Sequence, residues 1–377
     1  MTSLASLETP VLLLDEARMQ RNIDHMQARM NGLAVKLRPH AKTSKSAEVV
    51  KRQIAAGAQG ITVSTLKEAE NFFAAGITDI LYAVAIVPAK FDHALTLIKA
   101  GCKLGVITES VAAAEALSRH GRENGVLYPV MIEIDTDGHR SGVRPDDPLL
   151  IEIGRALTTE RGSGAQLAGV MTHAGGSYGF NTPEALEAMA EQERSRCVAA
   201  AQTLRDAGLA CPTVSVGSTP TALSARALEG VTEVRAGVYV FFDLVIANIG
   251  VCTPDDIAIS VLCSVIGHQR ESGWIITDGG WMSVSRDRGT QKQQKDFGYG
   301  LVCDAKGDPI PELSFDSANQ EHGVLTWTGD KGVDLTERFP IGSLLRILPN
   351  HACATAAQHE GYVVLPGFER WKRFNGW

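Results

Sequence analysis

At 377 residues the chain exceeds one ordinary compact domain and fits a large barrel with a second domain. Apolar residues make up 44% of it and aromatic residues 6%, which allows a sizeable core and excludes a disordered chain. The net charge is −7 and there is no long basic run, which argues against nucleic acid or an anionic membrane as a main partner.

The chain opens without a signal pattern, and no run of about 18 apolar residues occurs in it. The 7 cysteines are widely spaced and include no Cys-x-x-Cys pair, as expected of reduced thiols. We therefore expect a soluble, cytoplasmic protein.

Hydrophobic periodicity predicts an opening strand at 10–15 and a helix at 17–30. Further strands, alternating with helices, are predicted at 35–41, 60–65, 79–84, 103–108, 129–135, 167–173, 213–217 and 232–237. Several helical stretches end on a glycine, namely Gly57, Gly76, Gly101 and Gly208. This alternation predicts a (β/α)8 TIM barrel over residues 16–248. An open doubly wound sheet would also alternate, but no glycine-rich dinucleotide turn follows the first strand.

Beyond residue 250 the pattern changes to short β-rich runs separated by turn residues, at 257–266, 274–278, 323–328, 344–348 and 362–365. They predict a mostly antiparallel β domain over residues 249–377. The opening strand precedes the first barrel helix, so residues 1–15 are expected to join this second domain.

Lys42 stands at the end of the first predicted barrel strand, where barrels carry their active groups. Its amine can condense with an aldehyde and hold a cofactor as a Schiff base. The alternative is an ordinary surface lysine in a basic turn.

The predicted strand ends seven and eight offer groups suited to a phosphate. Gly217, Ser218 and Thr219 would provide exposed backbone N–H groups and two hydroxyls, and Gly237 and Tyr239 bring a glycine and a phenol. Once the barrel closes, these ends lie beside the first strand. The distance between the lysine and the phosphate site would then match pyridoxal phosphate (PLP), with its aldehyde near the lysine and its phosphate at the other site. An ordinary turn capping a helix is the alternative for the Gly-Ser-Thr stretch.

Two further strand ends fit the same cofactor. Arg140, after the fifth predicted strand, could hydrogen-bond the phenolic oxygen of PLP. His173, at the end of the sixth, could stack on the pyridine face. A surface charge and a satisfied core histidine are the respective alternatives.

A possible metal pair occurs late in the chain. In extended backbone, His351 and Cys353 would point to the same side, and imidazole with thiolate is a partial shell for zinc or another divalent ion. Two protein ligands leave open positions, which suits a catalytic metal. A buried cysteine beside a surface histidine is the alternative. His322 is a possible polar partner.

Seven stretches resemble those of a known family: RPHAKTSKS (38–46), GITVSTLKEAE (60–70), EIDTDGHRSGV (133–143), VGSTPT (216–221), RAGVYVFFD (235–243), NQEHG (319–323) and PNHACAT (349–355). The family is that of fold type III PLP enzymes, with eukaryotic-type D-serine dehydratases, D-threonine aldolases and D-threo-3-hydroxyaspartate dehydratases. The resemblance implies an alanine-racemase-like barrel with a C-terminal β domain, usually in a homodimer. It also implies that Lys42 is the Schiff-base lysine and that His351 and Cys353 bind a divalent metal (Zn, Mn or Mg).

Within this family, His-x-Cys is typical of dehydratases and His-x-Asp of aldolases. The chain also resembles the 3-hydroxyaspartate dehydratase branch at SRDRGT (285–290) and DFGYG (296–300). The resemblance thus implies dehydration of a small β-hydroxy D-amino acid, 3-hydroxy-D-aspartate or D-serine. A D-threonine or 3-hydroxyaspartate aldolase, a non-catalytic PLP carrier and a racemase are the alternatives. Arg286 and Arg288 are candidates for binding a β-carboxylate.

Overall fold

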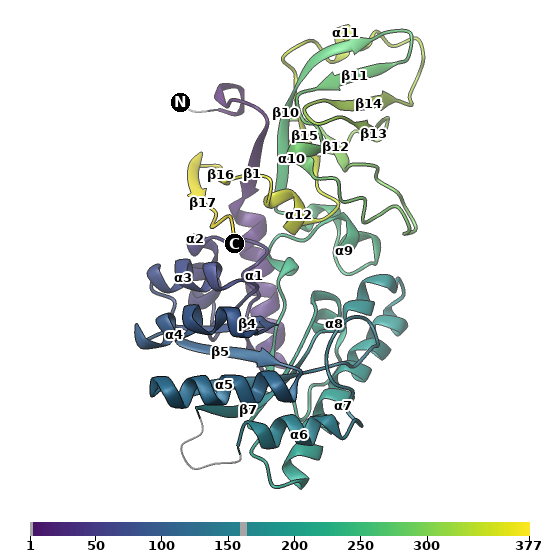
Figure 1. Ribbon diagram of the computed structural model, residues 1–377. Coiled ribbons are helices and arrows are strands. Elements are labelled where there is room, and N and C mark those ends of the chain that lie inside the picture. The colour runs from purple at the N-terminus through teal and green to yellow at the C-terminus, as the bar shows by residue number, and fades with distance from the viewer. Residues whose placement is uncertain (1–2, 159–163) are drawn as a thin grey trace. The chain divides into compact units, whose positions relative to one another are not determined.

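The computed structural model describes residues 3–158 and 164–377 (Figure 1). The chain divides into a barrel unit, residues 24–237 with 376–377, and a β unit, residues up to 23 with 238–375. Helix α1 (Glu16–Gly32) begins in the β unit and ends in the barrel unit.

The barrel unit contains an eight-stranded sheet in the order β2-β9-β8-β7-β6-β5-β4-β3. Its strands are β2 (Lys36–Leu37), β3 (Ile61–Val63), β4 (Asp79–Ala85), β5 (Lys103–Thr108), β6 (Tyr128–Ile134), β7 (Ala165–Thr172), β8 (Thr213–Val216) and β9 (Glu233–Val234). Every pairing in it is parallel. The sheet closes where His40 pairs with Thr62. The predicted alanine-racemase-like (β/α)8 barrel is confirmed.

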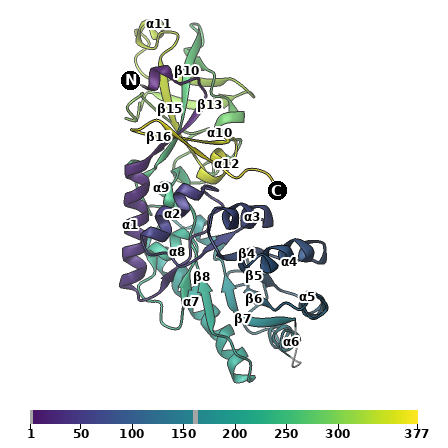
Figure 2. The same ribbon diagram turned by 90° about the vertical axis from the view of Figure 1, so that its left-hand side faces the viewer.

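Helices lie on the outer side of this sheet, around the strands labelled β4 to β8 (Figures 1 and 2). Short 3-10 helices belong to the same connections. Together these elements are α2 (Ala47–Ala55), α3 (Leu66–Ala74), η2 (Pro88–Lys90), α4 (Phe91–Lys99), α5 (Val111–Asn124), α6 (Leu149–Ala156), η3 (Gly175–Gly179), α7 (Pro183–Asp206) and α8 (Thr219–Ser224). Local chemistry sets their ends. The Thr65 hydroxyl accepts the Glu68 N–H at 3.0 Å and caps α3. The helix stops before Gly76, whose φ of +92° is left-handed.

Strand β2 is shorter than the predicted strand at 35–41. Pro39 has no N–H to donate, so a regular ladder ends before it. The chain nevertheless stays beside β9, because the N–H groups of Arg38 and His40 donate to the carbonyls of Val234 and Ala236 at 2.9 and 2.8 Å. The residues after His40 therefore lie at the carboxyl end of the barrel strands.

The β unit is a mostly antiparallel sheet of nine strands, as predicted. They are β1 (Val11–Asp15), β10 (Ile259–Gln269), β11 (Trp274–Thr277), β12 (Leu301–Cys303), β13 (Leu313–Ala318), β14 (Gly323–Trp327), β15 (Leu344–Leu348), β16 (Gly361–Leu365) and β17 (Glu369–Lys372). The opening strand β1 pairs with β10 and β16, which confirms that it joins this sheet. Leu13, Leu262 and Val363 from these three strands form a buried cluster.

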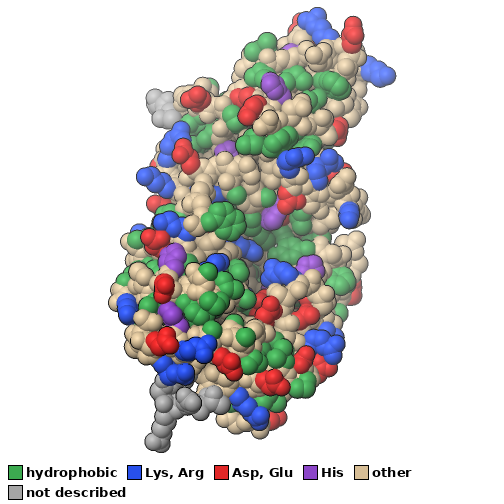
Figure 3. Space-filling model, viewed as in Figure 1, with side chains coloured by type: hydrophobic (Ala, Val, Ile, Leu, Met, Phe, Trp, Pro, Cys, Tyr) green, Lys and Arg blue, Asp and Glu red, His purple; other side chains and the backbone are tan. Residues whose placement is uncertain are grey.

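Short helices connect the strands of the β unit: η1 (Leu4–Ser6), η4 (Val238–Val240), α9 (Leu244–Asn248), η5 (Pro254–Asp256), α10 (Trp281–Val284), α11 (Leu335–Arg338) and α12 (Ala352–Ala356). On the face drawn in Figure 3, basic and acidic side chains are interspersed without a large area of one sign. Among the described residues, no helix has the length and apolar character needed to cross a membrane.

Candidate active site

Lys42 lies in the turn after β2, exposed between the buried residues Ala41 and Thr43. Its backbone N–H donates to His40 Nδ1 at 3.4 Å. Loss of solvation lowers the pKa of His40 well below its usual value, and the nearby cationic groups of Lys42 and Arg235 lower it further. A neutral imidazole therefore borders the lysine.

His173 follows β7, and its Nδ1 lies 2.9 Å from the carbonyl oxygen of Gly217. A carbonyl only accepts, so Nδ1 carries the proton and Nε2 keeps its lone pair. Loss of solvation lowers the pKa of His173 to about 3, and the charges of Lys42 and Arg235 add to this effect. His173 thus contacts the turn after β8 and also lies within the electrostatic influence of Lys42.

The turn of Gly217, Ser218 and Thr219 is buried and begins helix α8. Its N–H groups were expected to be exposed, but two of them are used within the protein. The Gly217 N–H donates to Glu193 at 3.0 Å, and the Ser218 N–H donates to Thr221 Oγ1 at 3.1 Å. Ser218 is the N-cap of α8, so its N–H needs a capping partner, and the N–H of the buried Gly217 needs an acceptor in place of water.

Two glycines allow the ends of neighbouring strands to approach closely. A Cβ on Gly217 would clash with the Arg235 carbonyl oxygen, and Gly217 has a φ of +138°. A Cβ on Gly237 would lie 2.9 Å from the His40 carbonyl oxygen and 3.0 Å from Thr43 Oγ1. The end of β9 therefore lies against both the turn after β8 and the turn that carries Lys42.

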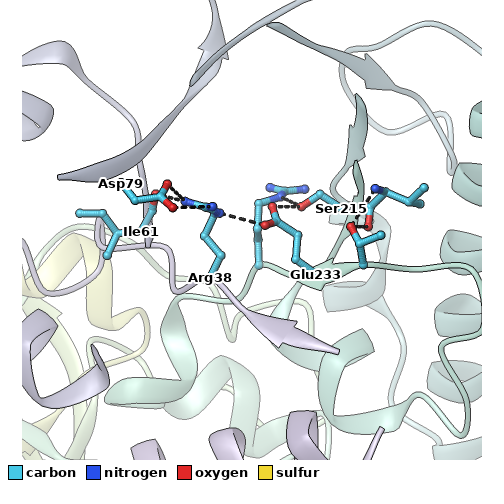
Figure 4. A network of polar contacts seen from close by, with 8 residues as sticks. Arg38, Ile61, Asp79, Ser215 and Glu233 are labelled. Carbon is cyan, nitrogen blue, oxygen red and sulfur yellow. Dashed lines mark hydrogen bonds and ion pairs between the residues drawn. The ribbon is translucent and has the colours of Figure 1, made fainter. Parts of the chain in front are cut away.

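Arg235 is buried inside the barrel and joins a network of polar contacts. Figure 4 shows Arg38, Asp79, Ser215 and Glu233 of this network. Its Nε donates to Ser215 Oγ at 2.8 Å, and the Ser215 hydroxyl donates to Glu233 at 2.7 Å. Glu233 also accepts from Arg38 Nε at 3.0 Å, and Arg38 pairs with Asp79 at 2.7 Å. Burial lowers the pKa of Arg235, which Glu233 partly offsets. Opposite charges therefore alternate from Asp79 to Arg235.

Arg140 is exposed in the loop after β6, with Nη2 3.8 Å from the buried carboxylate of Glu133. Its charge contributes to the lowered pKa of His173, so the two side chains lie within electrostatic range. Tyr239 is buried in η4 and belongs to the β unit rather than to the barrel unit.

His351 and Cys353 lie between β15 and the end of α12. The extended backbone expected for both residues is present at His351, with φ −134° and ψ 108°, and is wrong for Cys353, which is helical. The helix begins here because Asp243 Oδ2 accepts the Ala352 N–H at 2.8 Å. A side-chain hydrogen bond nevertheless joins His351 to Cys353.

Asp287 is the partner of His351, with Oδ2 2.6 Å from Nδ1. Burial lowers the pKa of His351, but Cys353 and Asp287 outweigh this effect and raise it to about 11. Asn350 supports the arrangement by donating to the carbonyls of Asp287 and Gly298 at 3.3 and 2.7 Å. Within 3–158 and 164–377, no three His, Cys, Asp or Glu side chains are grouped to hold a metal.

Both candidate carboxylate-binding arginines lie on aromatic rings. The Arg286 guanidinium is 4.9 Å from the Trp281 ring centre and that of Arg288 is 5.1 Å from the Tyr299 ring centre. Arg288 also pairs with Asp296 at 2.9 Å. His322 lies in the turn between β13 and β14.

Sequence reasoning assigned no role to Arg235, Asp287 or Glu193, and none to His40 as the neighbour of Lys42. Arg235 and Asp287 stand inside stretches that resemble the family, yet their contacts depend on residues far away in the chain. The sequence does contain a signal for Glu193, because this acidic residue lies on the apolar stripe of a long helix.

Comparison with known proteins agrees with this fold. Residues 14–245 match the family model described as the N-terminal domain of alanine racemase, and residues 258–365 match one for a serine dehydratase domain. The chain therefore belongs to the alanine-racemase-like family of fold type III PLP enzymes, as its motifs predict.

Individual relatives are similar over nearly the whole chain. It is 59% identical to the D-threo-3-hydroxyaspartate dehydratase of Delftia sp. (strain HT23), over 100% of this chain and 99% of the relative. The solved structure of that enzyme matches with a TM-score of 0.97 over 100% of both chains. The D-threonine aldolase of Arthrobacter sp. is 31% identical, over 96% and 90% of the two chains. The D-serine dehydratase of Dictyostelium discoideum is 29% identical, over 96% and 94%. These relatives are all lyases.

Proposed function

We propose that this protein is a PLP- and divalent-metal-dependent dehydratase, an ammonia-lyase, of β-hydroxy D-amino acids. Its first substrate would be 3-hydroxy-D-aspartate and its second D-serine, and the products would be a 2-oxo acid and ammonia. The observation that carries the proposal is 59% identity to D-threo-3-hydroxyaspartate dehydratase over the whole chain.

The barrel unit suits PLP by its donors. An exposed lysine lies on one strand end, and a turn with two hydroxyls lies on another. When bound, PLP supplies an electron sink for the charge that develops at Cα. Lys42 would hold the cofactor aldehyde through Nζ and, once displaced by substrate, would take the α-proton.

Further residues would orient the cofactor. Neutral His173 would stack on its ring, and Arg140 would donate to its phenolic oxygen. Arg235, a buried guanidinium, is the candidate for the ring nitrogen. The proposed phosphate contacts are Gly217, Ser218, Thr219, Gly237 and Tyr239.

His351 and Cys353 would bind the divalent metal. Imidazole and thiolate ligands favour Zn over Mn or Mg. Asp287 would accept the Nδ1–H of His351 and so present Nε2 to the metal. When bound, the metal supplies a Lewis acid for the β-hydroxyl, a poor leaving group. Solved structures of D-threo-3-hydroxyaspartate dehydratase include a histidine-to-alanine variant and a cysteine-to-alanine variant in a metal-free form, which supports this role.

The second candidate is an aldolase of D-threonine or 3-hydroxy-D-aspartate, favoured by the 31% identity to D-threonine aldolase. It would give glycine and an aldehyde instead of a 2-oxo acid and ammonia. Cys353 counts against it, because family aldolases carry aspartate at that position. A non-catalytic PLP carrier would retain the cofactor without turnover, and a racemase would need a second base on the opposite ring face.

The oligomeric state and the cellular location are part of the same proposal. A cytoplasmic homodimer acting on a small-molecule D-amino acid is what the family resemblance and the widely spaced cysteines support. Light scattering on the purified protein would give the mass of the assembly, and a monomer would contradict the dimer.

One assay decides between these functions. Purified protein with PLP and a divalent metal receives D-serine, D-threonine and both 3-hydroxy-D-aspartates, and ammonia and glycine are measured separately. Ammonia with oxaloacetate or pyruvate supports the dehydratase. Glycine with an aldehyde supports the aldolase. If neither ammonia nor glycine is formed, the result supports the carrier.

Lys42→Ala tests the cofactor assignment. We expect the visible absorbance of the bound cofactor to vanish and turnover to fall by about 1,000-fold or more, because the covalent attachment and the base are both lost. Lys67, exposed and paired with Glu70 at 2.9 Å, provides the control variant Lys67→Ala, which should keep both properties. Unchanged absorbance in Lys42→Ala would mean that another lysine holds the cofactor.

A further inference from the structure

Helix α7 carries one acidic residue on its buried stripe. That stripe consists of Leu186, Ala190, Glu193, Cys197, Ala200, Ala201 and Leu204. The spacing of three and four places Glu193 toward the core, where its exposed fraction is 1%. A carboxylate in such a place costs free energy unless hydrogen bonds replace the lost water. The partners of Glu193 therefore indicate its role.

One oxygen of Glu193, Oε1, accepts two backbone N–H groups. The first belongs to Ala174, directly after His173, at 2.9 Å, and the second to Gly217 at 3.0 Å. The side chain of Thr221, in α8, also hydrogen-bonds the carboxylate. A single side chain thus joins the segments that follow the paired strands β7 and β8.

The same two segments meet at further points. The Nδ1–H of His173 donates to the Gly217 carbonyl at 2.9 Å, so the backbone N–H and carbonyl of Gly217 are both used. The hydroxyls of Ser177 and Ser218 lie 2.9 Å apart and form a second link. Gly217 has no side chain with which to hold its own position. Its position therefore depends on these contacts, of which the one to Glu193 comes from outside both segments.

We infer that Glu193 is a positioning residue that sets the spacing between the loop of His173 and the turn of Gly217, Ser218 and Thr219. This rests on the proposed function, in which the turn binds the cofactor phosphate. Removing the acceptor leaves two buried N–H groups without a partner, and the turn shifts away from the loop after β7. The loss falls on the phosphate rather than on the aldehyde, because Lys42 belongs to the turn after β2.

The test compares two ligands that differ only by the phosphate. Cofactor-free protein is titrated with PLP and with pyridoxal, each followed by visible absorbance. Glu193→Asp keeps the charge but is one methylene shorter, and its PLP affinity should fall about 10-fold or more, with pyridoxal changed less than about 2-fold. Glu193→Ala should behave alike with a larger loss. Glu193→Gln keeps Oε1 as an acceptor and should stay within about 3-fold of the wild type for both ligands.

Glu191→Asp, on the same helix but exposed and paired with Arg194, is the matched control and should bind both ligands normally. Equal losses for PLP and pyridoxal in Glu193→Asp would make the residue merely structural and would overturn the inference, as would unchanged PLP affinity. If Glu193→Ala does not fold, Glu193→Asp and Ser177→Ala decide, the latter with a smaller phosphate-specific loss expected. A wild type without PLP absorbance would instead refute the proposed function.

Discussion

His173 belongs to the barrel unit and His351 to the β unit, and their surroundings shift the pKa of the same imidazole in opposite directions. The pKa of His173 is lowered to about 3 and that of His351 is raised to about 11. In both, Nδ1 faces the protein, toward the Gly217 carbonyl in one case and the Asp287 carboxylate in the other.

Burial lowers the pKa of both imidazoles, and the charges around each ring make the difference between them. For His173 the loss of solvation is the largest cause, and the positive charges of Lys42, Arg235 and Arg140 lower the pKa further. A neutral ring of this kind suits stacking on a cofactor. His351 has Asp287 beside it, a carboxylate–imidazole arrangement that suits a metal ligand.

The largest expected effect comes from removing the second member of the proposed metal pair. Cys353→Ala should lose its metal and about 1,000-fold or more of its turnover, because Lewis-acid help to the leaving group is worth several kcal/mol. Metal content by emission spectroscopy and ammonia release provide the readouts. PLP absorbance should persist. Cys252→Ala, a similarly half-buried cysteine of the β unit, is the control, and full activity in Cys353→Ala would remove the metal role.

A smaller effect is expected from the partner of His351. Asp287→Ala should weaken metal affinity about 10- to 100-fold, because the imidazole loses the group that orients it. Titration with Zn against a competing chelator measures the affinity, and the exposed Asp255→Ala serves as the control. An unchanged affinity would show that Asp287 does not orient His351.

The smallest expected effect is on the pH dependence of folding stability, to which His173 contributes through its lowered pKa. The unfolded chain takes up a proton at His173 below about pH 6.5, whereas the folded chain does so only near a pKa of about 3. Folding stability should therefore fall by about 1.4 kcal/mol per pH unit for this group as the pH drops from about 6 to 4. Burial also lowers the pKa of His40 and raises that of Glu193 and Glu133, so the whole protein shows a sum.

His173→Gln isolates the contribution of this histidine, because the other groups remain. Denaturant unfolding of the cofactor-free variant at pH 6, 5 and 4 should give a slope smaller than that of the wild type by about 1.4 kcal/mol per pH unit. Identical slopes would mean that His173 takes up its proton in the folded state, and the contrast with His351 would disappear.

Much of the fold could be predicted, because local patterns and burial agree along the chain. The strand expected at 103–108 is β5 (Lys103–Thr108), and the one at 344–348 is β15 (Leu344–Leu348). The first barrel strand was overestimated, since Pro39 interrupts its ladder. The helix at Cys353 was missed, because its first N–H, that of Ala352, is accepted by Asp243, a residue far away in the sequence.

By itself the sequence determined the alternation of strands and helices, the change to β-rich runs after residue 250 and the strand end on which Lys42 lies. These follow from hydrophobic periodicity and turn residues, which act over a few neighbours. Only the tertiary structure decided that Glu193 bonds Gly217, that Asp287 faces His351 and that Arg235 is paired inside the barrel. Such contacts join residues from separate elements, and their energies depend on burial and nearby charge, which no local pattern contains.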